Sequence, residues 1–261
     1  MEDLTVAIIQ SPIQWQKKSE NLTLFSDKIT AIKEDVGLIV LPEMFTTGFS
    51  MESNKLAETV TDQTVDWMLN HAKQMNSVIT GSFICEEDWA YYNRLIWAKP
   101  NGTFLHYDKK HLFRMANEHE HFNSGSKKMI IDLNGWRVCP LICYDLRFPV
   151  WSRNTSADNY DLLIYVANWP EKRRTAWSRL LSARAIENQS YVVGVNRIGN
   201  DGNGISYSGD SVVLDFNGEV MSSTKPCQDN VEIVNINYST LEAFRNSFPV
   251  LKDADSFNLM G

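Results

Sequence analysis

A cysteine at the end of an apolar run is the first residue of this chain whose type and position suggest catalysis. The run 138–142 carries no charge and leads into Cys143, and a polar and aromatic turn follows as far as Pro149. Such a run predicts a buried strand, and α/β sheets place their reactive groups at the carboxyl ends of strands. Most free cysteines, however, are small buried hydrophobes. Because a nucleophilic thiol also needs a base and an orienting group, the catalytic interpretation depends on the rest of the chain.

Glu43 and Lys109 occupy the same place relative to predicted strands as Cys143 does. Glu43 follows the apolar run 38–41, and Lys109 follows the run 103–107. Taken separately, an acid after a strand is usually a solvated loop residue, and a lysine in a basic stretch is usually surface charge. The sequence does not reveal strand direction, so their common placement raises the expectation of a shared pocket only modestly.

The elements around these residues follow the pattern of an α/β protein. The run 4–10 predicts a strand and the run 38–41 a second one. Between them, Ser19 is expected to cap a helix that ends at Gly37. Its apolar residues are spaced 3, 4, 3 and 4 apart: Leu22, Phe25, Ile29, Ile32 and Val36. Two strands joined through one helix are expected to be close neighbours in one sheet.

Helices and strands alternate again in the third quarter of the chain, and hairpins fill the remainder. Helices are predicted at about 61–74, in the segment from Ala176 to Ile186, and at 239–246. Further strands are predicted at 78–85, 94–98, 103–107, 129–133, 161–167, 191–196, 211–216, 219–222 and 231–236. The pattern predicts a single α/β domain with a mixed sheet or two packed sheets.

Composition and charge exclude several classes of function. The chain has 261 residues, of which 43% are hydrophobic, and its net charge of −7 comes without any Lys/Arg block, so nucleic-acid binding is not supported. No apolar run reaches the ~20 residues that span a bilayer, and the N-terminus has no basic region typical of a signal peptide. The four cysteines follow no disulfide or zinc spacing. We therefore expect a cytoplasmic enzyme with reduced thiols and no metal.

Three segments resemble the three signatures of the nitrilase superfamily of carbon–nitrogen hydrolases. They are Leu41 to Phe45, Tyr107 to Phe113 and Cys143 to Pro149, in matching order and spacing, and the likeness runs from about residue 4 to 237. The resemblance implies a four-layer α-β-β-α sandwich of two mixed sheets flanked by helices. It also implies one catalytic domain over 1–261 with a C-terminal tail from about 238, no cofactor, and a homodimer or higher homo-oligomer.

The resemblance also implies a role for individual residues. Glu43 matches the general base, Lys109 the catalytic lysine, and Cys143 the nucleophile; the adjacent Lys110 is in the wrong register. Glu118 resembles the second glutamate of the family. Glu120 lies two residues further on, so the choice between these two glutamates stays open.

These residue types suit amide hydrolysis through a thioester. A thiol is only slightly ionised near neutral pH, so Glu43 would take its proton and later pass one to departing ammonia. Lys109 and the backbone N–H of Tyr144 would stabilise the oxyanion, an effect worth about 3–4 kcal/mol per donor elsewhere. Water activated by Glu43 would then hydrolyse the thioester. The structural alternative is a Glu–Lys pair beside an inert thiol, although buried pairs rarely improve stability.

Within the superfamily, the segments 45–50, 114–119 and 144–154 are most similar to the bacterial omega-amidase branch. That resemblance implies a small amide substrate: 2-oxoglutaramate, 2-oxosuccinamate or a related 2-oxo acid amide. Arg173 or Arg174 would bind the substrate carboxylate bidentately, although either could be a solvated helix-start arginine. Four aromatic residues would form the walls of the pocket: Phe45, Phe49, Tyr144 and Trp169. Asp145 and Arg147 are expected to pair locally and shape the turn.

Two other classes of function remain open at this point. One is a different enzyme of the superfamily: an N-carbamoyl amino acid amidase, an aliphatic amidase or a nitrilase. The other is a binding protein that keeps the fold without turnover. We further expect a two-fold interface that uses Trp151 and the C-terminal residues Leu241, Phe244 and Phe248, unless these residues cover the core of their own chain.

Overall fold

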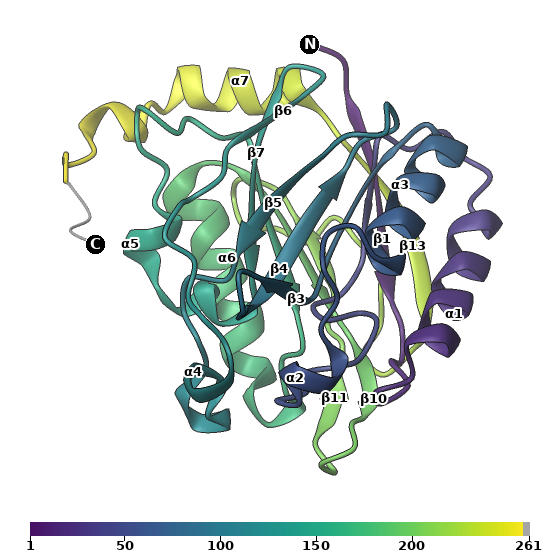
Figure 1. Ribbon diagram of the computed structural model, residues 1–261. Coiled ribbons are helices and arrows are strands. Elements are labelled where there is room, and N and C mark those ends of the chain that lie inside the picture. The colour runs from purple at the N-terminus through teal and green to yellow at the C-terminus, as the bar shows by residue number, and fades with distance from the viewer. Residues whose placement is uncertain (258–261) are drawn as a thin grey trace.

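Two mixed β-sheets pack face to face in the computed structural model, which describes residues 1–257 (Figure 1). The first sheet has the order β13-β1-β2-β3-β4-β5 and the second the order β12-β9-β8-β7-β6. In the first sheet β1, β2 and β3 are parallel, and in the second β7, β8 and β9 are parallel. The outer strands of both sheets run antiparallel to their neighbours. Each sheet is therefore mixed.

The strands have the following bounds. The first sheet contains β1 (Leu4–Gln10), β2 (Leu38–Val40), β3 (Val78–Glu87), β4 (Ala90–Ala98), β5 (Phe104–Asp108) and β13 (Asn230–Ile236). The second contains β6 (Ile131–Leu133), β7 (Trp136–Ile142), β8 (Leu162–Ala167), β9 (Tyr191–Asn196) and β12 (Val212–Leu214). A separate hairpin consists of β10 (Ile198–Asn200) and β11 (Ser206–Ser208).

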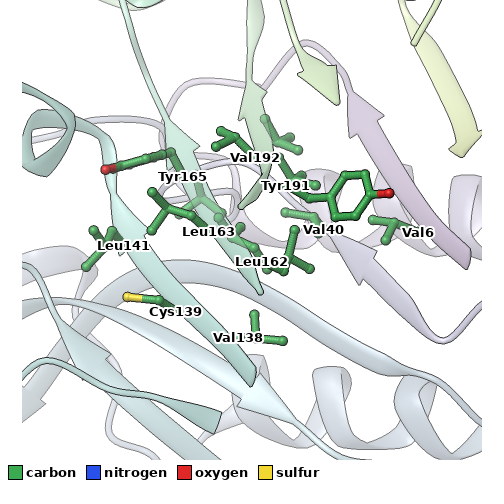
Figure 2. Close-up of a cluster of buried hydrophobic side chains, with 14 of the residues drawn as sticks. Val6, Val40, Val138, Cys139, Leu141, Leu162, Leu163, Tyr165, Tyr191 and Val192 are labelled. Atoms are coloured by element: carbon green, nitrogen blue, oxygen red, sulfur yellow. The ribbon is translucent and has the colours of Figure 1, made fainter. Parts of the chain in front are cut away.

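The side chains of the first sheet alternate between two apolar layers, because successive residues of a strand point to opposite faces. In β1, Val6 belongs to the core between the sheets and Ala7 to the core beneath the outer helices. In β2, Val40 belongs to the core between the sheets and Ile39 to the core beneath the outer helices. Figure 2 shows Val6 and Val40 beside Tyr191 of the second sheet. An uncharged run such as β1 is therefore buried on both faces.

Helices cover the outer face of each sheet and complete the four layers. The helices α1 (Lys18–Ala31) and α3 (Gln63–Met75) pack on the first sheet and α6 (Arg174–Asn188) on the second (Figure 1). The helix α7 (Tyr238–Ser247) lies across the end of the second sheet where β7 and β9 begin. The contact of α6 with β9 is close: a Cβ added at Gly194 would lie 2.6 Å from Cδ1 of Leu181. Three short helices lie in connections: α2 (Ser53–Leu56), α4 (Glu118–His121) and α5 (Pro149–Ser152). The expected α-β-β-α sandwich is confirmed.

Some predicted boundaries are wrong. The first helix ends at Ala31 because Ile32 is extended, and Ile32 and Val36 are instead buried in the connection to β2. Ser19 lies inside this helix, and Lys17 occupies the N-cap. The predicted strand 219–222 is reduced to a single bridge between Leu214 and Val220.

The C-terminal segment that begins with α7 packs against the rest of the chain. Leu241 of α7 is fully buried, and Arg245 forms a 2.6 Å ion pair with Asp161. Trp151 is also buried in the chain's own core. Leu241 and Trp151 therefore offer no exposed surface for a two-fold interface, whereas Phe248 remains 59% exposed.

Strand direction brings the predicted site residues to one end of the sandwich. Since β4 is antiparallel to both β3 and β5, β5 runs in the same direction as β2. Glu43 follows β2 and Lys109 follows β5, so both lie at the carboxyl edge of the first sheet. Cys143 follows β7 at the corresponding edge of the second.

Candidate active site

Lys109 lies at the centre of a fully buried charged cluster. Its Nζ is 2.9 Å from Oε1 of Glu43 and 3.0 Å from both carboxylate oxygens of Glu118. All three side chains have 0% exposure. Glu120, in contrast, is exposed. The structure therefore places Glu118, and not Glu120, against the lysine.

Charge pairing offsets the cost of burying these groups. Burial alone lowers the pKa of Lys109, but the carboxylates of Glu118 and Glu43 outweigh burial and hold the pKa above its usual value. Burial raises the pKa of Glu118, and Lys109 opposes this shift. The lysine is thus held as a cation at neutral pH.

Two asparagines that the sequence did not single out hold the carboxylates in place. Asn93 Nδ2 donates to Oε1 of Glu43 at 2.8 Å and to Oε1 of Glu118 at 3.4 Å, and its backbone oxygen accepts from the Lys109 N–H. The N–H of Asn168 donates to Oε2 of Glu43 at 2.7 Å, and Asn168 Nδ2 donates to the Glu43 backbone oxygen at 2.5 Å. Asn168 therefore links the end of β8 in one sheet to Glu43 in the other.

Cys143 opens a 3₁₀ turn, Cys143–Arg147, at the end of β7. Its backbone has the left-handed φ of +43° that non-glycine residues rarely adopt, and its side chain is 8% exposed. Burial and the nearby Glu43 carboxylate raise the pKa of the Cys143 thiol well above its usual value, and Lys109 opposes them. The thiol is therefore neutral at physiological pH and needs a base to react.

The Asp145 carboxylate fixes this turn to the loop that carries the lysine. It accepts from the Tyr107 hydroxyl at 2.7 Å, from the His111 N–H at 3.0 Å and from the Ile142 N–H at 3.1 Å. The expected local pair between Asp145 and Arg147 is wrong, because these contacts hold Asp145 inside the fold. Arg147 extends instead toward the Trp169 ring, with Cζ 4.9 Å from its centroid.

A cavity of about 440 Å³ opens above the thiol and the lysine. It is bordered by aromatic and other apolar side chains, by two arginines and by one acid. The lining residues are Phe49, Met51, Lys109, Phe113, Met115, Ala116, Cys143, Tyr144, Arg147, Asn168, Trp169, Pro170, Arg173, Asp201, Asn203, Ile205 and Tyr207. Of the four aromatics expected in the walls, Phe45 does not line the cavity: it is buried in the outer core against Phe25.

The two candidate arginines point to different places. Arg173 lines the cavity, with Cζ 5.4 Å from the centroid of the Phe113 ring. Arg174 lies outside the cavity and forms a 2.5 Å ion pair with Asp210. Arg147 is the second arginine of the cavity. Sequence reasoning missed it, although its place in the turn that Cys143 opens was a usable signal.

The described part of the chain contains no cluster of three or more His, Cys, Asp or Glu side chains that could hold a metal ion. In residues 1–257, no helix combines the length and apolar character needed to span a membrane.

We expect Lys109→Ala to lower amide turnover by about 10²–10³-fold, the size measured for loss of one oxyanion donor. Lys110 is the matched control, because its Nζ lies over the Trp151 ring at 5.6 Å, away from the charged cluster. Steady-state assays of both alanine variants, with thermal melting to verify folding, provide the measurement. An inactive Lys110→Ala beside an active Lys109→Ala would show that the lysines are assigned in the wrong register.

Comparison with known proteins identifies the family of this chain. The family model described as carbon-nitrogen hydrolase matches residues 5–246. The chain is 45% identical to omega-amidase YafV of Escherichia coli strain K12, covering 99% of this chain and 100% of that protein. It is 30% identical to 2-oxoglutaramate amidase of Bacillus subtilis strain 168, covering 95% and 96%.

The fold has a near match among solved structures. XC1258 from Xanthomonas campestris, a CN-hydrolase superfamily protein with an arsenic adduct in its active site, has a TM-score of 0.97 and 39% identity over the full length of both chains. The matched model covers most of the chain, and the relatives match it nearly end to end. The chain therefore belongs to the carbon–nitrogen hydrolase family.

Proposed function

We propose that this protein releases ammonia from the terminal amide of short 2-oxo acid amides, with 2-oxoglutaramate as the leading substrate. The observation that carries the proposal is a thiol beside a buried Glu–Lys–Glu cluster, beneath a cavity lined by Arg147 and Arg173. The relatives named omega-amidase and 2-oxoglutaramate amidase support the same substrate class.

Cys143 is the nucleophile of the proposed reaction. Because its thiol pKa is raised, Glu43 takes the proton as sulfur attacks the amide carbon. The developing oxyanion is stabilised by Lys109 and by the N–H of Tyr144, which stands at the start of a 3₁₀ turn where no intrahelical acceptor exists. Collapse of the tetrahedral intermediate breaks the C–N bond, and Glu43 returns the proton to the departing ammonia. Water then attacks the thioester with Glu43 again as the base.

Glu118 is proposed to position Lys109 and keep it charged. Its two oxygens lie at equal distances of 3.0 Å from Nζ, so one N–H can serve both. A second N–H binds Glu43. The third remains for the substrate oxygen, which is the arrangement that an oxyanion site requires.

The charges of the cavity favour a 2-oxo acid over an α-amino acid. Arg147 and Arg173 supply positive charge for a carboxylate. The acid of the lining, Asp201, is engaged at both oxygens: it accepts from the N–H groups of Asn203 and Ile205 and from the Tyr207 hydroxyl. An α-ammonium group would meet two arginines and only one carboxylate of the lining, Asp201, whose two oxygens already accept three hydrogen bonds.

The comparison of 2-oxoglutaramate with L-glutamine tests this proposal, because the two differ only at carbon 2. We expect kcat/KM to be at least about 100-fold higher for 2-oxoglutaramate, since placing like charges together costs several kcal/mol. Ammonia release with coupled detection gives both values. Equal or higher kcat/KM for glutamine would reject the 2-oxo acid assignment.

We also propose that the protein is a homodimer or higher homo-oligomer in a reducing compartment such as the cytoplasm. Free cysteines at Cys85, Cys139, Cys143 and Cys227 suit such a compartment. The exposed apolar side chains Val150 and Phe248 offer surface for a two-fold contact. Light scattering at micromolar concentration should give at least twice the chain mass of 29.9 kDa. A monomeric mass would remove this part of the proposal.

A further inference from the structure

We propose that the side-chain oxygen of Asn168 binds the –NH₂ group of the scissile amide and so selects amides over esters. This inference rests on the proposed amidase function and names the residue that recognises the leaving group. Asn168 lines the cavity and is 4% exposed. Its Oδ1 has no hydrogen-bond partner among the described residues.

The neighbouring contacts fix which end of the Asn168 amide is the oxygen. Nδ2 donates to the backbone oxygen of Glu43, an acceptor that could not pair with Oδ1. The backbone on both sides is also held: the Asn168 N–H donates to the Glu43 carboxylate, and the Trp169 N–H donates to Oδ1 of Asn196. The unpaired atom is therefore an acceptor in a rigid frame.

A buried acceptor without a partner costs free energy unless a ligand supplies a donor. Lys109 and Asn168, which line the same cavity as the thiol, differ in the hydrogen-bonding groups that they offer a substrate. Lys109 is a donor suited to the carbonyl oxygen of the substrate, whereas Asn168 Oδ1 can only accept. A primary amide has one carbonyl oxygen and two N–H donors, so it can satisfy both. An ester has no donor on its leaving group and would leave Oδ1 unpaired.

The same contact would orient the nitrogen for the proton transfer. Asn168 is bonded to Glu43 through its N–H and through Nδ2. An amide nitrogen held at Oδ1 would consequently lie near the carboxylate that protonates the departing ammonia. Asn168 would then have two roles: its Oδ1 would bind the substrate, and its two N–H donors would hold Glu43 in position.

The affinity of an inactive protein for an amide and its matching ester tests the proposal without relying on turnover. In a Cys143→Ala background, calorimetry with 2-oxoglutaramate and with the terminal methyl ester of 2-oxoglutarate should show about tenfold tighter binding of the amide. No preference in this single variant would overturn the proposal. The acyl group of the substrate is tested separately, by the turnover assay. If the parent protein prefers another acyl group, the amide and the ester used in calorimetry carry that group instead.

Two further substitutions separate recognition from support of Glu43. Asn168→Ala and Asn168→Asp both remove the Nδ2 donor to Glu43, but only Asn168→Ala removes the side-chain acceptor. In the Cys143→Ala background, we expect the amide preference to disappear with Asn168→Ala and to persist with Asn168→Asp. A preference that falls equally in both, or in neither, would show that Asn168 does not bind the amide nitrogen.

Discussion

Replacing Cys143 with alanine is expected to abolish ammonia release, by roughly 10⁶-fold if this nucleophile is as essential as those of other covalent hydrolases. Cys143 stands at the end of β7, and the Glu43 carboxylate beside it is the base proposed for its thiol, whose pKa is raised. Alanine keeps the Cβ and the same left-handed backbone, so folding should change little. The measurement is ammonia release by a purified variant whose thermal melting matches the parent.

The other three cysteines provide matched controls. Cys85 and Cys139 are buried and, unlike Cys143, do not line the cavity, so neither thiol can meet a substrate there. Cys227 is exposed and does not line the cavity. Each single alanine variant should keep most of its activity. Loss of turnover in a well-folded Cys227→Ala protein would contradict the assignment of Cys143 as the one required thiol.

Removal of either cavity arginine is expected to weaken the use of a charged substrate. Loss of one partner from a buried charge pair often costs about 2–5 kcal/mol, so Arg147→Ala and Arg173→Ala should each lower kcat/KM for 2-oxoglutaramate by about 30-fold or more. Arg147 is exposed, so solvent screening places its effect at the lower end of this range. The values are to be compared with those for an uncharged amide of similar size, which should change little.

Arg174→Ala is the control for both arginine variants. Arg174 is adjacent in sequence to Arg173 but pairs with Asp210 outside the cavity. Its removal should leave the ratio of the two kcat/KM values unchanged. Equal losses on the charged and the uncharged amide for Arg147→Ala and Arg173→Ala would show that neither arginine recognises the carboxylate.

Local patterns in the sequence were sufficient for much of the fold. The uncharged runs that became β1, β7 and β8 are buried strands, because their alternate residues serve two apolar layers. Helical periodicity gave a wrong prediction where apolar residues are buried without being part of a helix. Ile32 and Val36 continue the helical spacing of α1 and are buried, yet the backbone is already extended at Ile32.

The site was only partly predictable, because its supporting contacts are distant in sequence. The residues with obvious chemistry, Glu43, Lys109 and Cys143, were found from their places after strands and from the family motifs. Asn93 reaches Glu43 across 50 positions, and no local pattern marks it. The Asp145–Arg147 pair was mispredicted for the same reason, since Tyr107 binds Asp145 from 38 positions away.

A substrate panel with the parent protein tests the proposed 2-oxo acid amidase activity most directly. Ammonia release from 2-oxoglutaramate is compared with turnover of a simple nitrile and of an N-carbamoyl amino acid, under the same conditions. We predict rapid hydrolysis of 2-oxoglutaramate and little turnover of the other two, because the cavity presents two arginines for a 2-oxo carboxylate beside the Cys143 thiol. A protein that ignores 2-oxoglutaramate but cleaves the nitrile or the N-carbamoyl compound would contradict it.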